Sequence, residues 1–536
     1  MIYINRLFFN LLNSIRKVYL RSNLYDKKIS KINENNLIYR PSPHLLSSLI
    51  KYQKQKFKIE DFALDDIWNN RNISTKDFKR LNNFYWFFSL DLKSSKKNTQ
   101  SVIKNWIKNN YKFNEKSWNF DLTAKRIIAW LPCHNLTYEE NDKNYKDNFN
   151  IMIQKQANHL INEINRSNLI GDKLIGCASI ILVGLCYQNE KKYLSYGSSL
   201  LKKISKESLD NFGFPKSRNI KQLVFYLKYF ILIREWYKES QNNIPEHINE
   251  TIYYLGQGYA FIWQNINCDI FYNGNNISDN DNFDNYLKRL GYKFKNENQD
   301  FGEYIILKNK KICLTMDAGS TPSSTFSKDY QSGALSIEII SNGKKLITNC
   351  GYFKENNFKL NELSKSSATH NTLTIDDNSS CKFSKKNKFL LLKKGLKILK
   401  KNSVYEKNYW KINASHDGYQ KKYNTIHERE IEFYPEQETF IGNDKIIKKI
   451  NKNYKFDIRF HVEPNVKLMK TQDNKTILIQ LDNEGWKFTC NNFNINIDNG
   501  LYFGKKNSYI KNQNIFISGI SNNQIESIRW EIKKIQ

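Results

Sequence analysis

One residue that could take part in catalysis or binding is a histidine within a run of small polar side chains. The segment Ser366–Ile375 reads SSATHNTLTI, which places His370 and Asn371 just before an expected strand. A histidine at such a position can face a cleft and exchange protons, because its pKa lies near neutral pH. It can equally be a hydrogen-bonded residue of the core. Both interpretations are open, and the segment by itself favours the core.

An arginine in a turn between two apolar segments is the second candidate. The turn reads NFGFPKSRN over residues 211–219 and contains Lys216 and Arg218. A guanidinium binds a carboxylate through two parallel hydrogen bonds, so Arg218 is a candidate clamp for an acidic ligand. A plain connector between helices is the alternative.

The elements expected to position these residues are helices in the first half of the sequence. Residues 60–270 show mainly helical spacing, and the segments 175–184 and 223–233 are apolar on nearly all sides, as buried inner helices are. Repeated helix pairs of this kind predict a helical toroid. The aromatic run 84–88 is expected in its core, with a platform for stacking sugars as the alternative.

From about residue 269 onward, short strand-like segments alternate with Asn, Asp and Gly turns. Residues 335–339 and 345–351 flank a Ser-Asn-Gly turn and predict a hairpin. The same pattern continues to residue 536 and predicts an antiparallel β-sandwich.

The formal net charge of +31 over 536 residues has two interpretations. One is attraction to an acidic partner, such as a polyanionic sugar, nucleic acid or membrane surface. The other is a general abundance of Lys, Asn and Ile with no binding role. The basic residues are scattered and no nucleic-acid motif is present, so we expect no nucleic-acid partner. None of the eight cysteines forms a C-x-x-C pair, which argues against a zinc ribbon or a redox motif.

The first 22 residues combine apolar and basic side chains. Arg6, Arg16 and Lys17 make this segment too charged for a membrane span, and no signal-peptide cleavage site follows. The pattern predicts an amphipathic helix that either docks on the protein or makes peripheral contact with a membrane. Docking on the protein is favoured.

Three motifs in the second half resemble the C-terminal region of the heparinase II/III-like family. They read YQSGALSIE from Tyr330, TNCGY from Thr348 and KSSATHNT from Lys365, in the order and spacing of that family. With weaker matches elsewhere, the resemblance covers about residues 80–536. It implies a multidomain α+β fold, and the composition of the N-terminus adds a basic amphipathic segment over residues 1–59. The two domains that the resemblance implies are an incomplete (α/α) toroid over residues 60–270 and an antiparallel β-sandwich over residues 271–536.

Relatives in this family include polysaccharide lyases, which cleave a glycosidic bond beside a uronic acid by β-elimination. That reaction needs a neutralised uronate, a base and an acid. The resemblance implies catalytic roles for Arg218, for His370 in the family's histidine motif, and for Tyr226, the nearest equivalent of a family tyrosine. The lyases' first turn histidine aligns near Asp329 or Tyr330. The residues expected to contact substrate are Asn168, Lys216, Gln331, Asn371 and His416.

The resemblance also bears on metal binding. In zinc-bearing relatives the position of His370 contributes to a structural metal site, and the partner positions here fall on Gln331 and near Asn349. Neutral amides are weak zinc ligands, so we expect neither a metal nor another cofactor.

Three functions remain open from the sequence. The chain is a lyase acting on an acidic polysaccharide, a non-catalytic carbohydrate-binding or envelope-associated protein, or a glycosidase. The last needs paired carboxylates, which sequence spacing does not establish. Convergence of Arg218, Tyr226 and His370 would favour an enzyme. The family implies a periplasmic or cell-envelope location, whereas the lack of a clear signal peptide favours the cytoplasm. The sequence specifies no oligomeric state.

Overall fold

The computed structural model describes the chain except for residues 1, 33–36, 48, 50–67, 69–72, 91–95, 168, 188–190, 265, 267, 278–280, 355–356, 387–388, 506–507 and 536. The chain divides into two compact units. We call residues 1–208, 225–253 and 280–293 the helical unit, and residues 209–224, 254–279 and 294–536 the strand unit. The domain boundaries implied by the sequence stay predictions. The Arg218 turn belongs to the strand unit.

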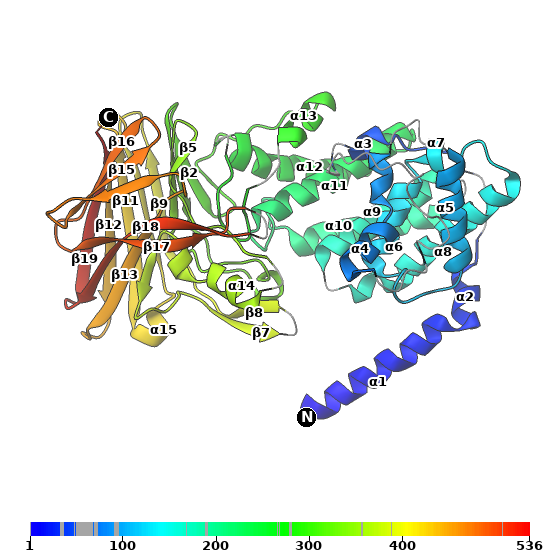
Figure 1. Cartoon of the computed structure of the whole chain (residues 1–536), viewed down its shortest axis with the longest axis horizontal. Coiled ribbons are helices and arrows are strands. Elements are labelled where there is room, and N and C mark those ends of the chain that lie inside the picture. Colours follow the sequence, from blue (N-terminus) through cyan, green and yellow to red (C-terminus); the bar gives the residue numbers. More distant parts are fainter. Residues whose placement is uncertain are drawn as a thin grey trace. The chain divides into compact units, whose positions relative to one another are not determined.

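The first part of the chain is helical, as expected (Figure 1). The helices are α1 (Ile2–Arg21), α2 (Asn23–Ile29), α3 (His44–Ser47), α4 (Thr75–Asn82), α5 (Lys96–Asn109), α6 (Phe120–Trp130), α7 (His134–Thr137), α8 (Lys143–Glu163), α9 (Ile170–Cys186), α10 (Lys191–Ser208), α11 (Ile220–Glu239), α12 (Glu246–Tyr259) and α13 (Asp281–Arg289). No helix among the described residues is long and apolar enough to cross a membrane.

Helix α9 is the inner helix that its apolar sequence predicts. Every residue from Leu174 to Cys186 is buried. A Cβ atom on Gly176 would lie 2.4 Å from the Phe120 ring, so this glycine allows α9 and α6 to approach closely. The aromatic run packs as core: Phe84 is fully buried, with its ring edge-to-face against Trp106 and Trp130.

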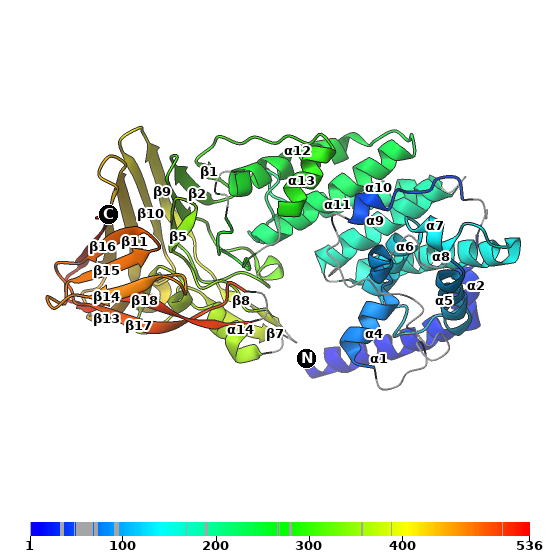
Figure 2. The ribbon, with the colours of Figure 1, turned by 45° about the horizontal axis from the view of Figure 1, so that its top comes forward.

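The second part of the chain forms antiparallel sheets (Figure 2). One sheet has the order β1-β2-β3-β4-β5, the largest is β14-β15-β16-β19-β12-β11-β10-β9, a third is β17-β18-β13-β6, and β7 pairs with β8. The strands are β1 (Asp300–Phe301), β2 (Tyr304–Lys308), β3 (Ile312–Asp317), β4 (Ile337–Ser341), β5 (Lys344–Ile347), β6 (Leu373–Ile375), β7 (Lys382–Lys386), β8 (Phe389–Lys394), β9 (Ile398–Tyr405), β10 (Trp410–His416), β11 (Thr425–Tyr434), β12 (Thr439–Lys448), β13 (Tyr454–His461), β14 (Lys467–Lys470), β15 (Thr476–Leu481), β16 (Glu484–Thr489), β17 (Ile495–Tyr502), β18 (Ile510–Ser521) and β19 (Ile525–Lys534). Short helices α14 (Phe358–Ser364) and α15 (Gln420–Tyr423) lie between strands.

Alternating burial shows why these segments pair as sheets. In β11, buried and half-buried residues alternate along the whole strand, so one face enters the core. The expected hairpin is confirmed as β4 and β5. Its turn residues Asn342 and Gly343 have φ of 46° and 79°, the left-handed pair that a two-residue hairpin turn requires.

Candidate functional site

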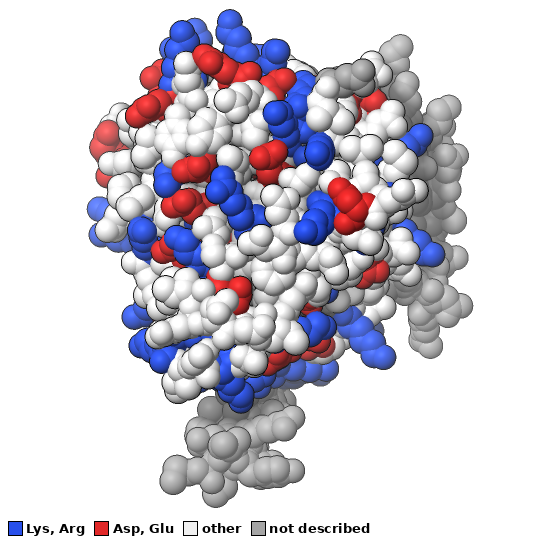
Figure 3. Space-filling model, turned by 90° about the vertical axis from the view of Figure 1, so that its left-hand side faces the viewer, with Lys and Arg blue, Asp and Glu red and all other residues white. Residues whose placement is uncertain are grey.

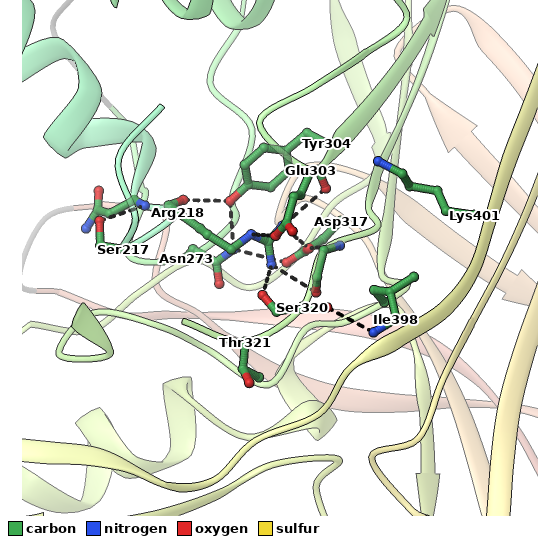
Figure 4. A network of polar contacts seen from close by, with 12 residues as sticks. Ser217, Arg218, Asn273, Glu303, Tyr304, Asp317, Ser320, Thr321, Ile398 and Lys401 are labelled. Carbon is green, nitrogen blue, oxygen red and sulfur yellow. Dashed lines mark hydrogen bonds and ion pairs between the residues drawn. The ribbon is translucent and has the colours of Figure 1, made fainter. Parts of the chain in front are cut away.

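Arg218 is the centre of a buried polar network (Figure 4). Its Nη2 atom lies 2.6 Å from Asp317 Oδ1, and its Nε atom lies 3.1 Å from Glu303 Oε2. Nη1 also donates to the carbonyl of Gly319 at 3.2 Å. Burial alone would lower the pKa of Arg218, but Asp317 and neighbouring groups hold it above its usual value. The guanidinium, on a residue only 4% exposed, is thus fastened inside the fold.

The backbone and a glycine make room for this arginine. Arg218 has a φ of 59°, an uncommon left-handed conformation for a side chain of this size. A Cβ atom on Gly319 would lie 2.3 Å from the guanidinium carbon of Arg218. A side chain at 319 would therefore require the guanidinium or the Glu303 carboxylate to shift.

Asn273 extends the network from Arg218 towards Gln331. Its Nδ2 atom donates to Asp317 Oδ2 at 3.0 Å and to the Tyr304 hydroxyl at 2.7 Å. The Tyr304 hydroxyl donates in turn to the carbonyl of Arg218 at 2.7 Å. The backbone N–H of Gln331 donates to Asn273 Oδ1 at 3.4 Å. The structure therefore brings two of the sequence-predicted site residues, Arg218 and Gln331, into one network.

Beside this network lies a second group of polar side chains, of which two are buried and two are half-buried. We call Asn219, Asp329, Tyr352 and Asn361 the Asp329 cluster. The half-buried Asp329 carboxylate accepts from Asn219 Nδ2 and from the Tyr352 hydroxyl, each at 3.3 Å. Asn361 Nδ2 donates to the Tyr352 oxygen at 3.2 Å. Two amides, one carboxylate and one phenol thus form a single hydrogen-bonded group.

Local structure explains why Asn219 points its amide N–H at Asp329. Asn219 precedes α11, and its Oδ1 atom accepts the backbone N–H of Gln222 at 3.1 Å as a helix cap. Capping fixes the amide so that Nδ2 faces the opposite way, towards the carboxylate. Gly274, with a φ of 89°, fits between the two residues, because a Cβ there would lie 2.7 Å from Asn219 Nδ2 and 2.8 Å from Asp329 Cβ.

Two buried side chains hold the loop that carries Asp329. The Lys365 ammonium donates to the carbonyls of Lys328 at 2.5 Å and Tyr330 at 3.2 Å. Burial lowers the pKa of Lys365 to about 8. Gln331 donates from Nε2 to the carbonyl of Ser364 at 2.6 Å and accepts from Gly274 at Oε1. The carboxylate is therefore presented by a loop that is fixed on both sides.

His370 lies in the interior, as the sequence segment by itself favours. It is 1% exposed, and its Nδ1 atom donates to the carbonyl of Ser366 at 2.8 Å. Burial lowers the pKa of His370 to about 4. Nε2 is therefore the unprotonated nitrogen, and it has no hydrogen-bond partner among the described residues. Strand β6 begins three residues later, at Leu373.

Asn371 and His416 are buried too. Asn371 Nδ2 donates to the carbonyl of Ile337 at 2.7 Å, and its Oδ1 accepts from the backbone of His461 at 2.6 Å. His416 Nδ1 accepts from the backbone of Gly418 at 3.0 Å, and its ring lies edge-to-face on His427. Both side chains stabilise the strand unit through these contacts.

The remaining predicted residues are distributed as follows. Tyr226 is 2% exposed in α11 within the helical unit, and burial raises the pKa of its hydroxyl despite a hydrogen bond with Ser208. Lys216 is half-buried in the same turn as Arg218. Asn168 lies outside the described residues. The catalytic and substrate-binding roles assigned from the sequence stay predictions.

The residues at the family's metal positions do not suit a metal ion. Both polar ends of the Gln331 amide are used in hydrogen bonds with the backbone. Asn349 Oδ1 accepts the backbone N–H of Asn371 at 3.0 Å, which leaves His370 as the one strong ligand type of the three. In the described part of the chain, no three His, Cys, Asp or Glu residues are grouped as metal ligands are.

On one face of the protein, basic side chains are mixed with acidic ones. Figure 3 shows one face on which Lys and Arg side chains are interspersed with Asp and Glu. Ladder pairs on the largest sheet are of this mixed kind, such as Lys411 with Glu430 at 3.0 Å and Lys445 with Glu428 at 3.1 Å. On this sheet, acidic side chains therefore offset part of the positive charge.

Residues 298–531 match the family model described as Heparinase II/III-like, C-terminal. This part of the chain is a heparinase II/III-like C-terminal region. The resemblance found in the sequence is therefore confirmed, and the matched residues include Asp329, Tyr352 and Asn361 of the Asp329 cluster. No curated protein sequence matches the chain.

The whole chain shares its fold with solved lyase structures. Heparinase III has a TM-score of 0.68 at 14% identity, covering 94% of this chain and 88% of that chain. The heparan sulfate lyase HepC from Pedobacter heparinus has a TM-score of 0.69 at 11% identity, covering 97% and 88%. The likeness confirms the expected fold, a helical toroid followed by a β-sandwich.

Proposed function

We propose that this protein cleaves an acidic polysaccharide beside a uronic acid by β-elimination, at the Asp329 cluster. The observation that supports the proposal is the half-buried Asp329 carboxylate hydrogen-bonded to the Tyr352 phenol on a clamped loop. The sequence resemblance places a lyase histidine near this same position. The solved relatives named above are a heparinase and a heparan sulfate lyase.

The chemistry assigns one task to each group. The Asp329 carboxylate takes the proton from C5 of the uronate, and the C4–O bond breaks as the C4–C5 double bond forms. The Tyr352 hydroxyl gives its proton to the departing oxygen, acting as general acid. Lys328 and Lys216, on the two loops that carry Asp329 and Asn219, supply positive charge that offsets the uronate and makes its C5 proton more acidic.

The test is absorbance of the unsaturated uronate, measured with the purified full chain on a panel of acidic polysaccharides. We expect Asp329→Asn and Tyr352→Phe each to lower the rate by about 100-fold or more. Tyr226→Phe is the matched control, since Tyr226 lies in α11 of the helical unit and outside the cluster. Loss of activity in Tyr226→Phe, with Tyr352→Phe fully active, would move the reaction to the tyrosine implied by the sequence.

A non-catalytic carbohydrate-binding function is the second candidate. It is favoured by one observation: Arg218, Tyr226 and His370 are all buried, and each has at least one polar atom hydrogen-bonded within the fold. In a parallel pull-down, binding of a polysaccharide that never gains absorbance would support this second function and reject the lyase proposal.

A further inference from the structure

Helix α1 of the helical unit turns its charged side towards the protein. Arg16 forms an ion pair with Glu163 of α8. Lys17 and Arg21 both pair with Glu115, at 2.7 Å and 3.0 Å. Leu20, on the same side, is only 8% exposed. This orientation is the reverse of the usual one, in which a helix packs its apolar face against the protein.

As a result, an apolar stripe on α1 faces away from the helical unit. Leu11, Ile15 and Val18 follow the i, i+4, i+7 spacing of one helix face and are 57%, 58% and 72% exposed. Leu12 and Tyr19 border them at 48% and 38%. The same spacing continues in the sequence at Leu7 and Ile4. Soluble proteins rarely expose a continuous apolar surface of this kind unless it binds something.

The charge around the stripe indicates what binds there. Residues 1–32 contain seven Lys and Arg and one Asp. Arg16, Lys17 and Arg21 are partly offset by Glu163 and Glu115, and the remaining basic residues lie at positions 6, 27, 28 and 31. Lys27 and Lys28, on the neighbouring helix α2, are exposed, and Leu24 in the first turn of α2 is 73% exposed. A second copy of the chain would bring like charges together. A bilayer surface with anionic lipid instead complements both the cations and the apolar side chains.

We propose that α1 is an interfacial helix that seats the apolar stripe of Leu11, Leu12, Ile15, Val18 and Tyr19 in the surface of an anionic bilayer. The helix lies in the plane of the interface, because it is amphipathic and too charged to span. This places a protein of polysaccharide-lyase fold at a membrane surface. The inference stands independently of the reaction proposed above.

The test is sedimentation of the full chain with vesicles of phosphatidylcholine, with and without phosphatidylglycerol. We expect the chain to sediment with the anionic vesicles, less so as salt is raised. The double variant Ile15→Glu/Val18→Glu should lower the partition coefficient by about tenfold or more. The matched control is Ile520→Glu/Ile525→Glu, which changes charge equally at positions 57% and 58% exposed in the strand unit.

Each outcome decides the question. Loss of binding in the α1 variant alone, with unchanged circular dichroism, supports the proposal. A chain that stays in the supernatant with both kinds of vesicle overturns it, as does equal binding by both double variants. Light scattering adds a further outcome: a dimer that Ile15→Glu/Val18→Glu converts to a monomer, without vesicle binding, would assign the stripe to a second copy.

Discussion

Arg429 and Asp444 form a two-point ion pair inside the largest sheet, with Nε 2.7 Å from Oδ1 and Nη2 3.1 Å from Oδ2. Neither side chain is exposed to solvent. The remaining guanidinium nitrogen, Nη1, donates to the carbonyls of Leu335 and Asn371. This pair therefore ties β11 and β12 to the hairpin and to the histidine motif, which lie in other parts of the sequence.

Removing one charge of this pair should cost much of the stability of the strand unit. Burial alone would raise the pKa of Asp444, but Arg429 and His427 hold it well below its usual value, so the carboxylate is ionised in the fold. Asp444→Asn leaves Arg429 as an unpaired buried cation, and we expect a loss of about 3–5 kcal/mol in the free energy of unfolding.

Urea denaturation of the full chain measures this loss. The control is Glu430→Gln, which breaks a partly exposed pair with Lys411 and should cost at most about 1 kcal/mol. Equal effects of the two substitutions would show that the buried pair has no special weight.

His370 should make stability depend on pH. Its pKa in the fold is about 4 because of burial, against about 6.5 in the unfolded chain. As pH falls, the unfolded chain takes up the proton first. The contribution of His370 is therefore fully present above about pH 6.5 and is lost as pH falls to about 4, a change of about 3 kcal/mol.

The comparison is between the chain and His370→Gln, with the free energy of unfolding measured from pH 7 to pH 4. The variant should be less stable at pH 7, because the packing of the ring is lost, but its stability should change less on acidification. Parallel pH curves for the two proteins would contradict the assignment of this titration to His370.

Gly274→Ala should disrupt the Asp329 cluster, because its Cβ would lie 2.7 Å from Asn219 Nδ2 and 2.8 Å from Asp329 Cβ. Gly343→Ala is a close control, with a φ of 79° against 89° and no atom within 4 Å of the added Cβ. Both substitutions introduce backbone strain of about 1 kcal/mol. Any greater loss of polysaccharide cleavage or binding by Gly274→Ala measures the crowding alone. Identical behaviour of the two variants would show that the close packing around Gly274 is unimportant.

Lys365→Met should free the loop that carries Asp329. The ammonium shares its three N–H groups among four carbonyls within hydrogen-bond distance, those of Ser327, Lys328, Tyr330 and Leu390. Leaving buried acceptors unpaired costs about 1–3 kcal/mol each, so the loop should open more often.

Trypsin cleavage after Lys328 reports this opening, and we expect it to become about tenfold faster or more in Lys365→Met, which corresponds to about 1.4 kcal/mol. The exposed Lys382, changed to Met in the control, should leave the rate unchanged. A rate equal to that of the control would show that the four carbonyls are held by other contacts.

The features that could be predicted from the sequence are those with a local signal. The apolar run of α9 identified a buried helix, and Asn342-Gly343 identified a hairpin turn. The small polar residues around His370 favoured a buried, hydrogen-bonded histidine. Asn219 also carried a local signal, since an asparagine before a helical run is a common cap.

The Asp329 cluster could not be assembled from the sequence. Asn219 and Asp329 are 110 positions apart, and their contact depends on how the turn before α11 lies against a loop of the β half. Arg218 is predicted to bind a ligand's carboxylate, and that role stays a prediction; the carboxylates that it contacts in the fold are those of Asp317 and Glu303. The chemistry of the guanidinium was recognised, but its partner depends on the tertiary structure.

The position of residues 209–224 within the strand unit limits which rearrangements of the gene would give a stable protein. Asp317, on β3, receives its guanidinium partner from a turn encoded about 100 codons earlier, between two helices. A gene rearrangement that exchanged only the β-encoding segment would leave a buried aspartate without its cation. We therefore expect the two halves of the gene to be inherited as one unit. We also expect substitutions at positions 218, 317 and 319 to be accepted only in combination.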